Sequence, residues 1–216
     1  LYYAPNENLN VRMFYFGRSA QPSTSQLMPV PDNSNPLNIS LGNPYLEPYF
    51  NHNVRMRFGY TNKKTFTSVH ARFGASLVEN PITNARWNDK GVQYSIPVNG
   101  PNSGSADLRV MVNSPFCSSG FSIFSMTYGR YNQSTSYQGT GKLDSGKYYN
   151  AAEATFDYKA FNEDHGNLDA SDAFISNLTQ TMNFTQRIRV TYRNDLVELR
   201  LGGRTSMSKS WYTMKD

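Results

Sequence analysis

Long segments in which polar and apolar residues alternate constrain this chain more than any other feature. Residues 52–61 read His-Asn-Val-Arg-Met-Arg-Phe-Gly-Tyr-Thr, so that an apolar residue occupies every second position. Successive side chains of a β-strand point to opposite faces, whereas the faces of a helix repeat every 3.6 residues. The pattern therefore predicts strands with one apolar and one polar face, and an all-β fold.

Seven segments of this kind run through the chain. They span residues 9–18, 52–61, 65–78, 105–114, 121–131, 178–192 and 197–211, and a shorter segment at 92–98 ends near Pro97. A strand of about ten residues, tilted by about 45°, rises roughly 23 Å, which matches the apolar band of a membrane barrel. Strands in soluble sandwiches are usually only about five or six residues long.

The connections between these segments alternate in length. The short ones are 62–64, 115–120 and 193–196, and the long ones are 19–51, 79–104 and 132–176. Every second connection of an up-and-down meander lies at the same end of the sheet, so one end should carry tight turns and the other large loops. The sequence therefore predicts an antiparallel meander that is part of a transmembrane outer-membrane β-barrel, with short periplasmic turns and long extracellular loops.

The two faces of these strands differ in a way that suggests their surroundings. We expect eight arginines to face the lumen: Arg55, Arg57, Arg72, Arg109, Arg187, Arg189, Arg200 and Arg204. We expect eight apolar residues to face lipid: Val54, Met56, Phe58, Leu178, Met182, Phe184, Ile188 and Val190. Alternation alone also fits a soluble β-sandwich binding module of the carbohydrate-binding type, and this remains the alternative.

Composition excludes several classes of protein. Aromatic residues make up 14% of the chain, which argues against disorder, although hydrophobic residues reach only 38%. The net charge of +5 is scattered rather than clustered, so nucleic-acid binding is not expected. Cys117 is the single cysteine and cannot form an internal disulfide. No run of about 18 apolar residues occurs, so no transmembrane helix is predicted.

One loop segment resembles a known family. Residues 32–48 read Asp-Asn-Ser-Asn-Pro-Leu-Asn-Ile-Ser-Leu-Gly-Asn-Pro-Tyr-Leu-Glu-Pro. This resembles the barrel of Bacteroidetes-type TonB-dependent outer-membrane receptors, in which Gly-Asn-Pro-x-Leu-x-Pro leads into a barrel strand. The segment departs from that pattern at Tyr45, where an acidic residue is usual, and at Tyr49, where Glu is usual. Residues 91–99 and 192–195 are also similar, and together with the spacing of the strands the resemblance covers most of the chain.

The resemblance implies a receptor or transporter in the outer membrane of a Gram-negative bacterium that takes up a nutrient. It also implies three partners: outer-membrane lipid, a plug domain of the same full-length protein, and a TonB-type energy coupler. Neither a plug domain nor an energy-coupling box is visible, and barrels of this class have about 22 strands. We therefore interpret residues 1–216 as a single barrel segment, a fragment without the plug domain and the rest of the barrel.

An isolated segment of about seven strands would leave two unpaired edges, and such edges recruit other strands. We expect it to self-associate through its edge strands or to close into a smaller barrel. An odd number of strands would make the two edges run parallel.

The long loops are the expected place of ligand recognition, because a rigid scaffold would hold them. The third long connection combines rings with carboxylates, which suits a sugar or a peptide. The candidate ligand-binding residues are Tyr137, Tyr148, Tyr149, Tyr158 and Asp164. His165 lies among Glu163, Asp164, Asp169 and Asp172, but the spacing is not that of an EF-hand and no metal site is expected. No catalytic motif is present, so we expect neither an enzyme nor a cofactor.

Overall fold

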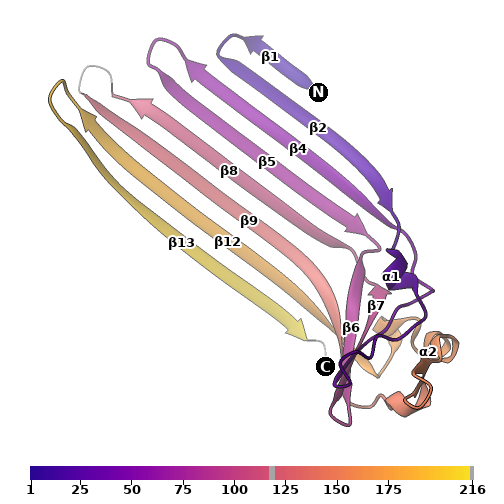
Figure 1. The fold of residues 1–216 in the computed structure, drawn as a ribbon. Helices are drawn as coiled ribbons and strands as arrows, with labels where there is room; N and C mark the ends of the chain where they lie inside the picture. Colours follow the sequence, from indigo (N-terminus) through magenta and orange to yellow (C-terminus); the bar gives the residue numbers. More distant parts are fainter. Residues whose placement is uncertain (117–119, 215–216) are drawn as a thin grey trace.

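The computed structural model describes residues 1–116 and 120–214 of the chain. Its largest part is one curved antiparallel sheet, and loops, short strands and helices gather at one end of that sheet (Figure 1). Cys117 lies outside the described residues.

Eight strands of the described part follow one another through the sheet as an up-and-down meander. They are β1 (Tyr2–Asn6), β2 (Leu9–Ala20), β4 (Tyr49–Asn62), β5 (Thr67–Glu79), β8 (Ser103–Pro115), β9 (Phe121–Gly139), β12 (Phe174–Arg193) and β13 (Glu198–Met214). Each pairs antiparallel with the strand before it in this series. The predicted all-β meander of long strands is therefore confirmed.

The seven predicted long strands are all present, but the expectation that they make up the whole meander is wrong, because it misses the five-residue strand β1. This strand contains Pro5 and shows no polar–apolar alternation, yet Tyr2 pairs with Arg12 and Tyr3 with Val11 of β2. With eight meander strands among the described residues, β1 and β13 run antiparallel to each other, so the expectation of parallel edges is also wrong.

Asparagine side chains close three of the tight turns in the same way. The Oδ1 atom of Asn6 accepts hydrogen bonds from the backbone N–H groups two and three residues later, both at 3.0 Å. Asn62 and Asn194 repeat the arrangement, with N···O distances between 2.7 and 3.3 Å. An asparagine that bonds to the backbone just after it mimics a backbone turn, so these residues end one strand and allow the next to begin.

The three long connections lie together at the other end of the sheet, as predicted (Figure 1). We call this region the cap and define it as residues 21–48, 80–102 and 140–173. It contains α1 (Thr24–Leu27), β3 (Asn38–Ser40), β6 (Ile82–Asp89), β7 (Val92–Asn99), η1 (Ser145–Lys147), β10 (Tyr149–Asn150), β11 (Thr155–Phe156), α2 (Tyr158–His165) and η2 (Leu168–Ala170). Of these elements, the sequence predicted only the strand that corresponds to β7.

The strand β6 forms a hairpin with β7 that the sequence analysis missed. Its turn residues, Lys90 and Gly91, both have positive φ angles, of 50° and 84°. Two successive positive φ angles fit the tight hairpin turn whose twist matches that of the flanking strands, and glycine adopts such angles without strain. The hairpin joins the main sheet because β6 pairs in parallel with the cap end of β9.

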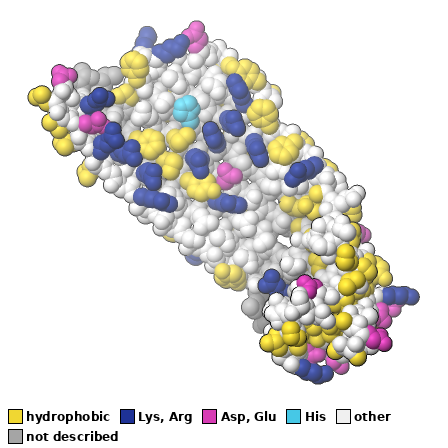
Figure 2. All heavy atoms as spheres, viewed as in Figure 1, with side chains coloured by type: hydrophobic (Ala, Val, Ile, Leu, Met, Phe, Trp, Pro, Cys, Tyr) yellow, Lys and Arg dark blue, Asp and Glu magenta, His cyan; other side chains and the backbone are white. Residues whose placement is uncertain are grey.

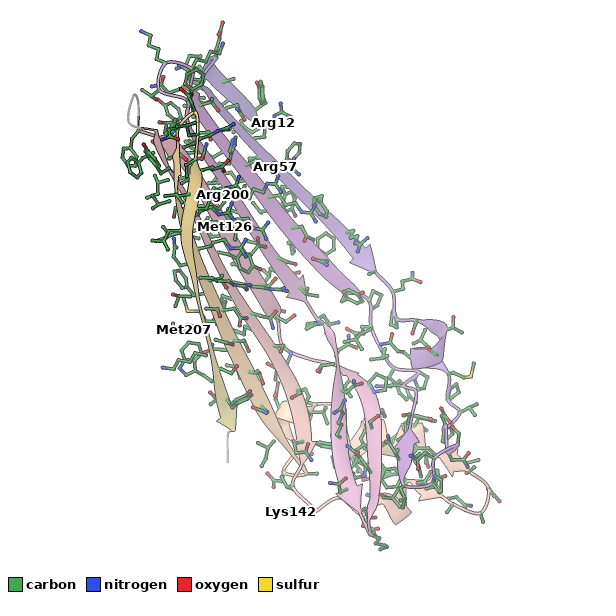
Figure 3. The ribbon with its side chains drawn as sticks, turned by 60° about the vertical axis from the view of Figure 1, so that its left-hand side comes forward. Arg12, Arg57, Met126, Lys142, Arg200 and Met207 are labelled. Atoms are coloured by element: carbon green, nitrogen blue, oxygen red, sulfur yellow. The ribbon has the colours of Figure 1, made fainter. Side chains whose placement is uncertain are left out.

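Register divides the sheet into two chemically different faces. Across four neighbouring strands, one row of paired residues is Met13, Met56, Phe73 and Leu108. The next row is Arg12, Arg57, Arg72 and Arg109, and it points to the opposite face because successive side chains of a strand alternate. We call the first the apolar face and the second the arginine face. Arg12, Arg57, Met126 and Arg200 point to the concave side of the sheet, and Met207 points away from it (Figure 3).

All eight predicted arginines lie on the arginine face, and all eight predicted apolar residues lie on the apolar face. Several of the latter are well exposed, including Met182 at 43% and Ile188 at 45%. That lipid covers the apolar face remains a prediction. A sandwich would need a second large sheet packed on this face, and the described residues contain none.

The sheet is open, and its edge strands β1 and β13 do not pair with each other. The smaller closed barrel considered from the sequence is therefore not formed, whereas self-association through the edges remains a prediction. No helix among the described residues is both long enough and apolar enough to cross a membrane.

Two neighbouring residues near the middle of β12 test the assignment of the faces. In the full-length protein, Phe184→Arg should reduce the folded form in the outer membrane, because a charge on the lipid face of a barrel costs about 2–4 kcal/mol near the bilayer midplane. Asn183→Arg adds the same charge on the arginine face and should be tolerated. The measurement is the amount of heat-modifiable, folded protein in outer-membrane fractions. Equal losses from both variants would contradict the assignment.

Candidate functional site

The cap has its own hydrophobic core, which the meander lacks. The buried apolar residues of this core come from all three long connections and from the adjoining strand ends: Ile39, Leu41, Ala85, Trp87, Tyr94, Ile96, Val98, Tyr137, Leu143, Tyr148, Phe156, Tyr158, Phe161, Leu168, Ala173 and Phe174. A core of this kind can hold loops in one arrangement, because interiors pack as densely as organic crystals.

Trp87 of β6 lies at the centre of this core and is only 1% exposed. Its ring stacks on Tyr94 at 5.3 Å and on Phe161 of α2 at 5.7 Å between centroids. Its indole Nε1 donates a hydrogen bond of 2.8 Å to Ser145 Oγ in the third connection. The second and third connections are therefore fixed to each other through one side chain.

The family-like segment of the first connection is tied to the end of β7 by side-chain amides. Asn43 Nδ2 donates to the carbonyl oxygen of Pro97 at 2.9 Å. Asn99 Oδ1 accepts from the N–H of Glu47 at 2.8 Å, and Asn99 Nδ2 donates to the carbonyl oxygens of Glu47 and Asn80, both at 3.1 Å. Residues 42–48 thus belong to the rigid part of the cap.

The helix α2 faces this segment. Asp157 begins the helix by accepting a hydrogen bond of 3.0 Å from the N–H of Ala160. Tyr158 and Phe161, three residues apart and therefore on one face of the helix, are buried in the core of the cap. Helices this short are marginal in isolation, so α2 depends on that packing.

A cleft of about 390 Å³ lies between residues 43–47, β7 and α2. Its lining residues are Asn43, Tyr45, Glu47, Ile96, Val98, Asn99, Tyr158, Phe161, Asn162, His165, Gly166 and Leu168. Carboxamides, a carboxylate, an imidazole and rings therefore converge on one concave surface. Apolar walls with a few convergent polar groups are typical of small-molecule sites, and this mixture offers both donors and acceptors to an uncharged polar ligand.

A chain of hydrogen bonds runs beside the cleft. Lys147 Nζ and the Tyr148 hydroxyl both donate to Asp164 Oδ2, at 2.5 and 2.6 Å. The Tyr148 oxygen is also 3.2 Å from His165 Nε2, and His165 Nδ1 is 2.8 Å from Ser171 Oγ. The hydrogen bonds from Lys147 and Tyr148 lower the pKa of Asp164. Burial lowers the pKa of His165, although the charge of Asp164 acts in the opposite direction.

The predicted ligand-binding residues are mostly engaged with the protein itself. Tyr137, Tyr148 and Tyr158 are buried in the core of the cap, at 3%, 6% and 8% exposure. Tyr149 is half-buried and packs edge-on against Tyr94, and Asp164 holds Lys147 and Tyr148. Of the five, only Tyr158 lines the cleft.

Most residues that line the cleft were not predicted from the sequence. Asn43, Tyr45 and Glu47 lie in the segment that carries the family resemblance, so that motif was the available signal. Asn162 and His165 follow Tyr158 on α2, but nothing local in the sequence places them opposite the first connection.

The acidic residues around His165 are dispersed. Glu163 pairs with Lys159 at 3.9 Å, and Asp169 accepts a hydrogen bond of 3.2 Å from the Tyr137 hydroxyl. Within the described residues, no three histidine, cysteine or acidic side chains are placed to hold a metal ion together.

Comparison with known protein families identifies the family of this chain. A model described as the outer membrane protein beta-barrel family matches residues 1–198. This range includes the whole cap and every meander strand up to β12, and it ends at the first residue of β13. No curated protein matches the chain.

The lowered pKa of His165 makes the cap sensitive to pH. An imidazole whose pKa is lower in the folded than in the unfolded state takes up its proton mainly on unfolding. Stability should therefore be highest above the unfolded pKa of about 6.5 and should fall as the pH drops below it. Asp164 stays ionised in this range because its pKa is lowered.

Hydrogen exchange of the α2 amides in the full-length protein at pH 7.5 and 5.5, corrected for intrinsic rates, measures this effect. Protection should decrease at pH 5.5 in the wild type and change much less in His165→Gln. An equal decrease in both proteins would assign the pH dependence to other groups.

Proposed function

We propose, from the premise that this chain belongs to the outer membrane protein β-barrel family, that it is part of a receptor or transporter that meets its ligand at the cap. The chain lies in the outer membrane with its family. The proposed activity is TonB-dependent uptake of a nutrient in a Bacteroidetes-type receptor. The observation that carries the proposal is the cleft, which lies in a packed cap at the end of the sheet opposite the tight turns.

The chemistry of the cleft favours an uncharged polar ligand, such as a sugar or a short peptide. Asn43 and Asn162 can exchange hydrogen bonds with hydroxyl or amide groups, and Tyr45 presents a ring at 47% exposure. Glu47 brings a negative charge to the same surface, which disfavours a strongly anionic ligand at this position.

We further propose that the chain acts by binding and passage, without catalysis. Ser171 and His165 are at hydrogen-bond distance, which is an arrangement that hydrolases also use. However, Ser171 does not line the cleft, and its Oγ also lies 3.3 Å from the N–H of Ala173. The pair stabilises the chain that follows α2.

Because the third connection builds the core, deleting residues 139–166 would remove Tyr148, Phe156 and Phe161 from it and expose Trp87. Loss of uptake after that deletion would report an unfolded cap. Point substitutions on the cleft surface are therefore the sharper test.

Tyr45→Ala in the full-length protein should lower the initial rate of uptake about tenfold at low ligand concentration, because truncation of an aromatic anchor costs more than about 1 kcal/mol and about 1.4 kcal/mol corresponds to a tenfold change in affinity. Leu37→Ala, which truncates an exposed side chain of the cap outside the cleft, is the matched control and should leave uptake unchanged. Uptake is measured with a panel of radiolabelled oligosaccharides and short peptides, in cells that lack or carry the protein. If Tyr45→Ala takes up its substrate at the wild-type rate, the cleft is not the recognition site.

Dependence on energy coupling is tested separately. Uptake of the same labelled substrate should fall to the background of cells without the protein when the TonB-type coupler is deleted. Uptake that persists without the coupler would identify a passive pore and would contradict the TonB-dependent part of the proposal.

A further inference from the structure

The arginine face carries an unusual concentration of uncompensated charge. Most of the Lys and Arg side chains visible on this face gather over the half of the sheet nearer the tight turns (Figure 2). Arg12, Arg57, Arg72 and Arg109 lie directly opposite one another on four successive strands. Like charges in such positions repel each other. None of the four lies within 4.0 Å of a carboxylate among the described residues.

A hollow lies beside this row on the side of the tight turns. Its volume is about 400 Å³, and it lies between β2, β4 and β5. Its lining residues are Asn10, Arg12, Arg57, Phe58, Gly59, His70, Ala71, Arg72 and Met111. Arg12 and Arg57, which both line this hollow, point to the concave side of the sheet (Figure 3).

A missing side chain creates the floor of the hollow. Gly59 lies between Asn10 and His70 on the arginine face, in the next row toward the tight turns. A Cβ atom at this position would lie 2.9 Å from Asn10 Nδ2, so a larger residue would displace the carboxamide and fill the space. Glycine here keeps the floor open between the three guanidinium groups.

The groups around the hollow are suited to an anion. Three guanidinium groups, the amide of Asn10 and the imidazole of His70 can all donate hydrogen bonds, and no carboxylate lines the space. Asp107 lies on the cap side of the arginine row, where its Oδ1 covers Gly74. The guanidinium of Arg12 rests 5.1 Å from the centroid of the Tyr2 ring, which helps to hold it in place.

We propose that this hollow, formed by Asn10, Arg12, Arg57, Gly59, His70 and Arg72, binds an oxyanion group of a solute in the lumen. Phosphate, sulfate and carboxylate groups all present pairs of oxygen atoms. The guanidinium fork can bind such a pair through two parallel hydrogen bonds. The site is separate from the cleft of the cap and does not depend on the proposed recognition there.

The same design recurs between the last two meander strands. A hollow of about 430 Å³ is lined by Arg187, Ile188, Arg189, Arg200, Gly202, Gly203 and Arg204. Again a glycine opens the floor and arginines surround it. Its recurrence on other strands supports a role in binding, because a single gap in a row of side chains could arise from packing alone.

Titration calorimetry of the purified full-length protein with inorganic pyrophosphate at low salt tests the proposal. The wild type should bind, and the double variant Arg57→Gln/Arg72→Gln should bind at least about tenfold more weakly, because each charge-assisted pair is among the stronger hydrogen bonds. The double variant Arg57→Lys/Arg72→Lys keeps both charges but loses the forked geometry, and it should bind with intermediate affinity.

Lys63→Gln/Lys64→Gln is the matched control, since it removes two positive charges from a tight turn whose lysines do not line the hollow, and it should leave the affinity unchanged. Heat-modifiable migration verifies that each variant is folded, and the lysine variant provides the test if the glutamine variant does not fold.

Three results would overturn the proposal: no binding by the wild type, equal affinity in the wild type and the arginine variants, or an equal loss in the turn control. A wild type that binds no pyrophosphate, together with arginine variants that lose thermal stability only at low salt, would show that acidic side chains of the same polypeptide occupy the hollow. Because uptake is not measured, none of these outcomes bears on the cleft of the cap.

Discussion

The hydrogen-bonded register between neighbouring strands is the constraint on which the rest of this structure depends. The meander strands from β2 to β13 pair along almost their whole length. For example, residues 177–193 of β12 pair without interruption with residues 198–214 of β13. Backbone groups in a bilayer must find their partners within the sheet, since lipid offers none. The same register decides which side chains share a face, and a slip of one residue would exchange the two faces. The apolar face and the arginine face therefore follow from one set of backbone pairings.

The chain uses two different means of stabilisation at its two ends. The meander buries almost no apolar side chain within the protein, whereas the cap encloses a core around Trp87. This division explains why rings in the third connection serve packing. Three long loops without a core would be mobile, and a cleft between them would not keep its shape. The tyrosines that appeared suited to a ligand instead fix the walls on which other residues, such as Tyr45 and Asn162, are presented.

The positive charges are also divided between the two regions. The arginines on the arginine face are Arg12, Arg18, Arg55, Arg57, Arg72, Arg109, Arg130, Arg187, Arg189, Arg193, Arg200 and Arg204, and among the described residues only Arg86 lies elsewhere. The described lysines lie in turns, in the cap or on the apolar side of β13, and none of them is on the arginine face. Arginine is the residue that combines a permanent charge with stacking on rings and a forked donor pattern. Its guanidinium lies over an aromatic ring of the same face at Arg12, Arg55, Arg109 and Arg189. The cap and the arginine face of the sheet thus present different chemistry.

The sequence by itself determined the meander, its two faces and the end at which the large loops lie. These features follow from a period of two and from connection lengths, which are local properties of the chain. The short strand β1 escaped because Pro5 interrupts it and no alternation marks it; the asparagine turn at Asn6 was its only signal. Of the two strands of the hairpin β6–β7, the sequence predicted only β7. Only the tertiary structure decided which rings are buried and where the cleft lies. Trp87 meets Ser145 across 58 positions, and Asn99 meets Glu47 across 52. Contacts between such distant residues depend on how three loops pack together, and a pattern read along the chain contains no record of that packing.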